Sequence, residues 1–172
     1  MDNLEINSFI FINDKPYPSP NLIRKDYNEL VWEFIPGLNL SSLGRVEQID
    51  ILNKISILQS DLFDSNDNEM IIHGDLHPDN IIVSNNTFYM VDWDLAYIGF
   101  IINDVYNLYT SPQLHLNYEE RVNYIRMITK ENIDVIQNNI NNFVSNKIYE
   151  LSLLEKNKDH SKNLINAYQG IY

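Results

Sequence analysis

The stretch that most constrains the fold of this chain is IIHGDLHPDNIIV, residues 71–83. The aliphatic residues on either side are typical of short buried strands, and the glycine and proline between them indicate a loop. The loop carries His73, Asp75, His77, Asp79 and Asn80. Polar and charged side chains so close to buried strands need hydrogen bonds or a cation to offset the loss of water. The sequence therefore predicts a polar site at the edge of a core.

A β-hairpin is expected directly after this loop. Residues 81–84 and 87–91 are predicted as strands joined by a polar turn, and the second strand leads into Asp92. If both strands belong to one small sheet, Asp92 lies near Asp75 and Asn80. Carboxylate and amide oxygens are ligands that suit Mg²⁺, which completes its shell with water and with substrate phosphates.

The remaining pattern predicts an α+β fold. Short strands are expected at 8–12 and 30–35, before a break at Pro36-Gly37, and a helix is expected at 45–63. From Asn103 onward the apolar residues recur at spacings of three and four, which is typical of amphipathic helices. Strands and one helix come first in this order, and helices alone follow. Such an order is expected of an α+β domain.

Composition excludes several kinds of function. The 172 residues hold 12 Lys and Arg against 24 Asp and Glu, and no Lys or Arg lies between Ile55 and Glu120. This charge distribution argues against binding to nucleic acid. Cysteine is absent, which excludes disulfides, thiolate nucleophiles and cysteine-bound zinc. The sequence has no apolar run of membrane-spanning length and no basic start typical of a signal peptide, so we expect a cytoplasmic protein without membrane contact.

Two motifs together resemble those of a known enzyme group. HGDLHPDN at 73–80, followed by VDWD at 91–94, is similar to the catalytic half of the aminoglycoside phosphotransferase and choline kinase-like family, which has the protein-kinase-like fold. WEFIPG at 32–37 looks like the hinge between the lobes of that fold. The resemblance implies a kinase-like C-terminal lobe over residues 41–172, mostly helical with a small catalytic hairpin. A remnant of the N-terminal small lobe, with the hinge, would occupy residues 1–40.

The resemblance also implies roles for individual residues. Asp75 would be the catalytic base, which accepts the proton of an acceptor hydroxyl as that hydroxyl attacks the γ-phosphate of ATP or GTP. Asn80 and Asp92 would hold Mg²⁺. The nucleotide base would contact the hinge at Glu33, Phe34 and Ile35, and supporting roles fall to His73, Asp94 and Asp104.

The acceptor implied by the resemblance is a small molecule that carries a hydroxyl group. The helices that follow Asn103 are expected to build its site. Because an acidic cleft attracts cations, acceptors such as amino sugars or choline-like amines are favoured.

The chain departs from the family pattern before the hinge. Kinase-like enzymes carry a glycine-rich phosphate loop and a strand lysine there. Residues 1–29 contain no glycine, Lys15 lies in a proline-rich turn, and Arg24-Lys25 is expected beside a loop. Most of the small lobe is therefore expected to be missing. Either the chain works with a separately encoded small-lobe fragment, as part of a split or truncated kinase, or it is a kinase-like binding module with weak or no activity.

The loop also allows a different chemistry. His73, Asp75, His77 and Asp79 alternate along the chain like the ligands of a binuclear metal-dependent hydrolase. Pro78 argues against this alternative because it interrupts the regular strand alternation that the pattern would need.

Overall fold

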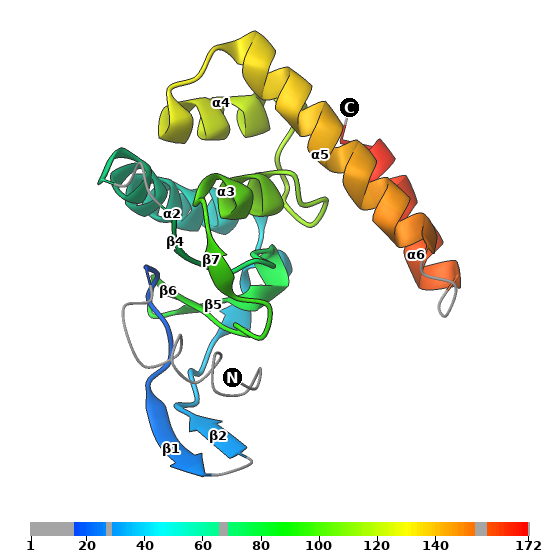
Figure 1. Cartoon of the computed structure of the whole chain (residues 1–172). Coiled ribbons are helices and arrows are strands. Elements are labelled where there is room, and N and C mark those ends of the chain that lie inside the picture. The colour runs from blue at the N-terminus through cyan, green and yellow to red at the C-terminus, as the bar shows by residue number, and fades with distance from the viewer. Residues whose placement is uncertain (1–15, 27–28, 66–68, 154–157, 172) are drawn as a thin grey trace.

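The structure of the chain is a computed structural model that describes residues 16–26, 29–65, 69–153 and 158–171. In Figure 1 a two-stranded sheet lies at one end of the molecule, two further small sheets lie in the middle, and helices form the rest. This arrangement confirms the predicted α+β fold with a mostly helical C-terminal part.

The described strands form three antiparallel sheets. β1 (Leu22–Asp26) pairs with β2 (Glu29–Trp32), β5 (Ile81–Ser84) lies between β3 (Leu38–Asn39) and β6 (Thr87–Met90), and β4 (Met70–Ile72) pairs with β7 (Tyr97–Gly99). The polar loop at 73–77 therefore begins at the end of β4, and it ends at a 3₁₀ turn, η2 (Pro78–Asn80), that leads into β5.

The hairpin predicted over residues 81–91 is confirmed as β5 and β6. Ile81 lies opposite Met90 in the register of this pair. The turn residues Asn85 and Asn86 have φ angles of 49° and 61°. A two-residue hairpin turn of type I′ needs positive φ at both positions, and asparagine tolerates that region better than most residues.

Five α-helices are described. They are α2 (Arg45–Ser65), α3 (Ile102–Tyr109), α4 (Tyr118–Thr129), α5 (Ile133–Leu153) and α6 (Lys158–Gln169). Helix α4 contacts α2, α3 and α5, whereas α5 and α6 lie along each other as a pair that extends away from the other helices (Figure 1). A capping box starts α4: the Asn117 side chain accepts from the Glu120 N–H, and the Glu120 carboxylate accepts from the Asn117 N–H.

The hydrophobic core joins the helices to the hairpin. Its helical members recur at spacings of one, three and four: Ile51, Leu52 and Ile55 of α2, Val122, Ile125 and Ile128 of α4, and Ile136, Ile140 and Val144 of α5. Leu76 of the polar loop and Ile81 and Met90 of the hairpin are also fully buried. The loop is therefore attached to the core through Leu76, while its neighbouring polar side chains remain at the core's edge.

Predictions about the first 40 residues are partly wrong. Arg24 and Lys25, which were expected beside a loop, lie within β1, whose residues pair with β2 through main-chain hydrogen bonds. The strand expected at 30–35 begins at Glu29 and ends at Trp32. The strand expected at 8–12 lies outside the described residues.

Arg121 organises the connection between α3 and α4. Its guanidinium is buried and donates to the backbone carbonyls of Tyr109 (2.7 Å), Ser111 (2.8 Å), Leu114 (3.0 Å) and Leu116 (3.2 Å). Burial lowers the pKa of Arg121 to about 10. A buried cation is tolerated here because backbone dipoles take the place of water.

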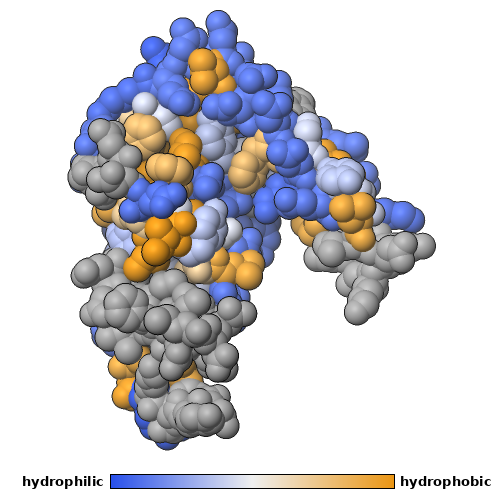
Figure 2. Space-filling view, viewed as in Figure 1, coloured by the Kyte–Doolittle hydropathy of each residue, from blue (hydrophilic) through white to orange (hydrophobic). Residues whose placement is uncertain are grey.

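Polar side chains cover much of the outer surface of the helices (Figure 2). In Figure 2 hydrophilic side chains predominate at the end of the molecule where α4 meets α5. Asn138, Asn141 and Asn142 are exposed on α5, opposite its buried stripe. None of the helices in the described ranges is long and apolar enough to cross a membrane.

Candidate active site

The start of the polar loop is held by α3. Asp104 is fully buried, and its carboxylate accepts hydrogen bonds from the backbone N–H groups of His73 (2.8 Å) and Gly74 (3.0 Å). Burial raises the pKa of Asp104 to about 6, although these two hydrogen bonds act in the opposite direction. Gly74 has φ 80°, and a Cβ at this position would collide with the carbonyl oxygen of Leu95. Glycine is therefore required where the chain turns toward Asp75.

His73 connects the loop to the end of the hairpin. Its ring is buried against Trp93, with 4.8 Å between ring centroids, and its Nε2 lies 2.8 Å from the carbonyl oxygen of Val91. Burial lowers the pKa of His73. The neutral ring can donate from Nε2 to the residue that immediately precedes Asp92. Asp92 itself is exposed and has φ 60°, so its backbone is left-handed.

Asn80 links the backbone of Asp75 to the backbone of Val91, the residue before Asp92. Its backbone carbonyl accepts from the N–H of Val91 at 2.9 Å, and its Nδ2 donates to the backbone carbonyl of Asp75 at 3.0 Å. The hairpin thus places Asn80 next to the chain segment of Asp92, as predicted from the sequence. Asp94 is exposed two residues further on. The metal-binding and supporting roles of these residues stay predictions.

The carboxylate of Asp75 has a neighbour that its own loop supplies. Nε2 of His77 lies 3.5 Å from Oδ2 of Asp75, and both side chains are partly exposed. The hydrogen bond from His77 lowers the pKa of Asp75, against the effect of burial. In return, Asp75 raises the pKa of His77. Asp75 is therefore ionised near neutral pH, as a proton acceptor must be.

Asp79 is fixed by residues remote in sequence. Its carboxylate accepts hydrogen bonds from the Ser41 hydroxyl and the Gln113 amide, and its backbone carbonyl accepts from Asn39 Nδ2 at 2.8 Å. Ser41 lies in a 3₁₀ turn, η1 (Leu40–Ser42), and contacts the loop from there. Sequence reasoning missed Ser41 and Gln113 because no local motif connects them to residue 79.

These contacts give the hydrolase alternative no support. Nε2 of His73 faces a backbone carbonyl, and the Asp79 carboxylate is occupied by two donors. Across the described ranges, no group of three or more His, Cys, Asp and Glu side chains is arranged to hold a metal ion. Of the four alternating residues, His77 and Asp75 contact each other, whereas His73 faces the Val91 carbonyl and the Asp79 carboxylate faces Ser41 and Gln113.

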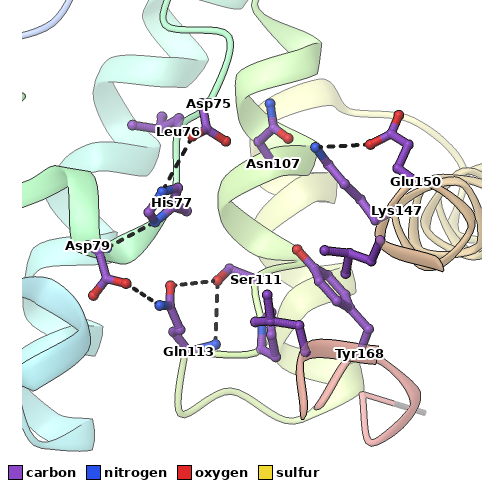
Figure 3. A pocket seen from close by; sticks show the side chains of 13 residues that line it. Asp75, Leu76, His77, Asp79, Asn107, Ser111, Gln113, Lys147, Glu150 and Tyr168 are labelled. Atoms are coloured by element: carbon purple, nitrogen blue, oxygen red, sulfur yellow. Dashed lines mark hydrogen bonds and ion pairs between the residues drawn. The ribbon is translucent and has the colours of Figure 1, made fainter. Parts of the chain in front are cut away.

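A cavity of about 370 Å³ opens beside Asp75 (Figure 3). The loop and the α3–α4 connection form one wall, and α5 and α6 form the other. The lining residues are Asp75, Leu76, His77, Asp79, Asn107, Ser111, Pro112, Gln113, Lys147, Glu150, Leu151, Leu164 and Tyr168. That the helices after Asn103 build the acceptor site stays a prediction, and nothing in the sequence singled out Glu150 or Tyr168 of this cavity.

The helical wall of this cavity carries a charged pair and an aromatic ring. Nζ of Lys147 lies 3.7 Å from Oε2 of Glu150 and 5.8 Å from the centre of the Phe143 ring. Burial raises the pKa of the Tyr168 hydroxyl, and Asp75 adds to this effect. Lys147 in turn helps to lower the pKa of Asp75. The two walls are therefore electrostatically coupled across the cavity.

The predicted hinge residues follow β2. Glu33 is tied to Asn21: its backbone N–H donates to the Asn21 carbonyl at 2.8 Å, and its carboxylate accepts from Asn21 Nδ2 at 2.6 Å. Phe34 is 84% exposed and Ile35 is half-buried. Gly37 then packs against the backbone of Val83 in β5, where a Cβ would not fit. The hinge segment thus leads directly into β3, which pairs with β5, the strand that follows Asn80.

Together, fold and site define a class of protein. A helix-anchored polar loop with an ionised aspartate, followed by a hairpin that ends in an acidic residue and by a helical lobe, is the arrangement of a kinase-like phosphotransferase. A sequence model of the phosphotransferase enzyme family matches residues 18–127, more than half of the chain. The chain belongs to this family.

Solved structures have the same fold. The apo form of a thermostable mutant of aminoglycoside phosphotransferase APH(4)-Ia superposes with a TM-score of 0.61 and 14% identity over 98% of this chain and 82% of that chain. Its ternary complex with ADP and hygromycin B gives a TM-score of 0.60 and 12% identity, over 98% and 81%. ADP-bound APH(2'')-Ib gives 0.55 and 12%, over 96% and 79%.

A relative in sequence is the protein LicA homolog of Mycoplasma capricolum subsp. capricolum. It is 29% identical over 46% of this chain and 50% of its own length. The chain thus spans about half the length of this curated relative.

Proposed function

We propose that the chain is the catalytic part of a Mg²⁺-dependent kinase that transfers the γ-phosphoryl group of ATP, or GTP, to a hydroxyl group of a small molecule. One observation carries this proposal: Asn80 bonds the backbone of Asp75 on one side and the backbone of Val91, next to Asp92, on the other. These links support a base, Asp75, that lines a cavity open to an acceptor, with the two proposed oxygen ligands on the chain segments bonded to it.

Asn80 and Asp92 are the residues that would hold Mg²⁺. The Nδ2 of Asn80 is engaged with Asp75, which leaves the amide oxygen as the ligand atom, and Asp92 offers an exposed carboxylate. Two oxygen ligands suit Mg²⁺, which usually takes one or two protein groups and completes its shell with water and phosphate oxygens. When bound, the ion would neutralise charge on the nucleotide phosphates.

Asp75 would act on the acceptor. The acceptor oxygen forms a bond to the γ-phosphorus, the bond from that phosphorus to the bridging oxygen of the nucleoside diphosphate breaks, and the hydroxyl proton passes to the Asp75 carboxylate. The lowered pKa of Asp75 keeps it ionised for this role, and Asp104 holds the loop from which it projects.

The remaining parts of the enzyme follow from this placement. Residues 1–40 would be what remains of the small lobe with the hinge, where Glu33, Phe34 and Ile35 meet the nucleotide base, and residues 41–172 would form the catalytic lobe. A separately encoded small-lobe fragment would supply the phosphate-covering strands. The acceptor would enter the cavity between the loop and α5–α6. We favour a cationic acceptor, because acidic residues predominate in the sequence and the APH(4)-Ia complex contains hygromycin B. The proposed place of the reaction is the cytoplasm.

The test is an assay of the purified chain for nucleoside diphosphate release with Mg-ATP and a panel of hydroxyl acceptors that includes amino sugars and choline-like amines. We expect acceptor-dependent turnover, and we expect Asp75→Asn to lower it by about 10²–10⁴-fold, with unchanged affinity for Mg-ATP. Asp61→Asn is the matched control, because Asp61 is exposed on α2 and does not line the cavity. Turnover that survives Asp75→Asn would reject Asp75 as the base. Nucleotide or acceptor binding without turnover would favour the kinase-like binding module instead.

A further inference from the structure

The ring of His77 is held at both nitrogens. Its Nδ1 accepts a hydrogen bond from the backbone N–H of Asp79 at 3.3 Å, and its Nε2 lies 3.5 Å from Oδ2 of Asp75. A nitrogen that accepts from an N–H carries no proton of its own. In the neutral ring the proton is therefore on Nε2, where it faces Asp75.

The backbone that carries His77 is itself anchored. His77 is the N-cap residue of the η2 turn, with Pro78 in the first turn position. The next residue, Asp79, is fixed by Ser41 and Gln113 through its carboxylate and by Asn39 through its carbonyl. The imidazole therefore has a defined place in the cavity wall.

Asp75 has complementary restraints. Its backbone carbonyl is held by Asn80, whereas its carboxylate has His77 as its hydrogen-bonding neighbour within the loop. The torsion about Cα–Cβ of an aspartate has three staggered positions, so backbone restraint alone does not aim the carboxylate. Both His77 and Asp75 line the cavity, where the direction of the carboxylate matters for an acceptor.

We propose that His77 is a positioning residue: its Nε2–H holds one carboxylate oxygen of Asp75 and so aims the other oxygen at the acceptor hydroxyl. This inference rests on the proposed function. It differs from a purely structural role for His77 because it predicts a loss in kcat that leaves nucleotide binding and folding intact.

Two substitutions of His77 distinguish the roles of its two ring nitrogens. His77→Asn keeps an oxygen that can cap the turn at the Asp79 N–H but cannot reach Asp75, whereas His77→Gln places an amide donor near the position of Nε2. We expect His77→Asn to lower kcat by about 10–100-fold, with the KM for Mg-ATP and the Tm close to parent values. His77→Gln should recover most of the loss. His115→Asn is the matched control, because His115 is exposed and does not line the cavity.

Parent-level kcat in His77→Asn, or equal losses in the Asn and Gln variants, would overturn the proposal. If the parent itself shows no turnover, the proposed function fails, and ¹⁵N NMR of the imidazole then decides the matter for His77. We expect the Nε2–H tautomer and a shift of the Nε2 signal in Asp75→Ala that is absent in Asp61→Asn. An Nδ1–H tautomer, or no response to Asp75→Ala, would overturn the inference.

Discussion

The buried carboxylate of Asp104 accepts a hydrogen bond from the backbone N–H of His73, with 2.8 Å between Oδ2 and N. Residue 104 lies in α3, beyond the hairpin, whereas residue 73 begins the loop that carries Asp75. The contact therefore joins two segments that the hairpin separates in sequence. It makes the geometry of the loop depend on a buried acid whose charge is costly in this environment.

Stability should depend on pH through Asp104. Its pKa is raised to about 6 in the folded chain, above the ordinary value of 3.8, so the folded state binds the proton more tightly than the unfolded state does. Its contribution to the free energy of unfolding is thus present in full below pH 3.8 and is lost as pH rises toward about 6, by at most about 1.4 kcal/mol per pH unit. Urea titrations of parent and Asp104→Asn across this range measure it, and a pH-independent difference would contradict it.

Asp92 should govern the response to magnesium. We expect parent chain to gain ~2.7 kcal/mol of stability when free Mg²⁺ reaches about a hundred times its dissociation constant. Asp92→Asn should gain much less, and asparagine suits the left-handed backbone at this position, where φ is 60°. Thermal melts in chelator and in millimolar Mg²⁺, at fixed ionic strength, compare the two, with Asp61→Asn as control. Equal gains in Asp92→Asn and parent would show that Asp92 binds no metal.

Arg121 should be important for folding. Replacing it by methionine removes the donors to four backbone carbonyls in a buried connection, and each unsatisfied buried group costs about 1–3 kcal/mol. We expect Arg121→Met to lower the free energy of unfolding by about 3 kcal/mol or more. Arg126→Met, at an exposed position of the same helix, should change it by less than about 0.5 kcal/mol. Urea unfolding of both variants provides the comparison, and equal effects would exclude the proposed role.

Lys147 and Glu150 should influence the choice of acceptor in opposite directions. Lys147→Met removes a positive charge from the cavity wall, so the KM for a cationic acceptor should fall by about three- to tenfold. Glu150→Gln removes the adjacent negative charge and should raise that KM by a similar factor. A neutral hydroxyl acceptor serves as the control and should respond weakly to both changes. A cationic acceptor that is insensitive to both substitutions does not occupy this cavity.

Local chemistry in the sequence was sufficient to predict the hairpin and the loop. Two short apolar strands around Asn85-Asn86 indicate a two-residue turn, and glycine and proline indicate a loop between residues 73 and 80. The backbone neighbourhood of Asn80 and Val91 therefore follows from short-range rules. The buried apolar faces of α4 and α5 were also predictable, because apolar residues at helical spacing form a face that has to be buried.

Tertiary structure alone decided which distant groups meet at the loop. Ser41 and Gln113 reach Asp79 from two separate segments, and Glu150 and Tyr168 face Asp75 from the last two helices. Strand β1 was missed because its pairing depends on main-chain hydrogen bonds, which the side-chain pattern of the sequence does not report. Periodicity reports which face of an element is buried, but it does not report what that face is buried against. Such contacts are set by the packing of the whole chain.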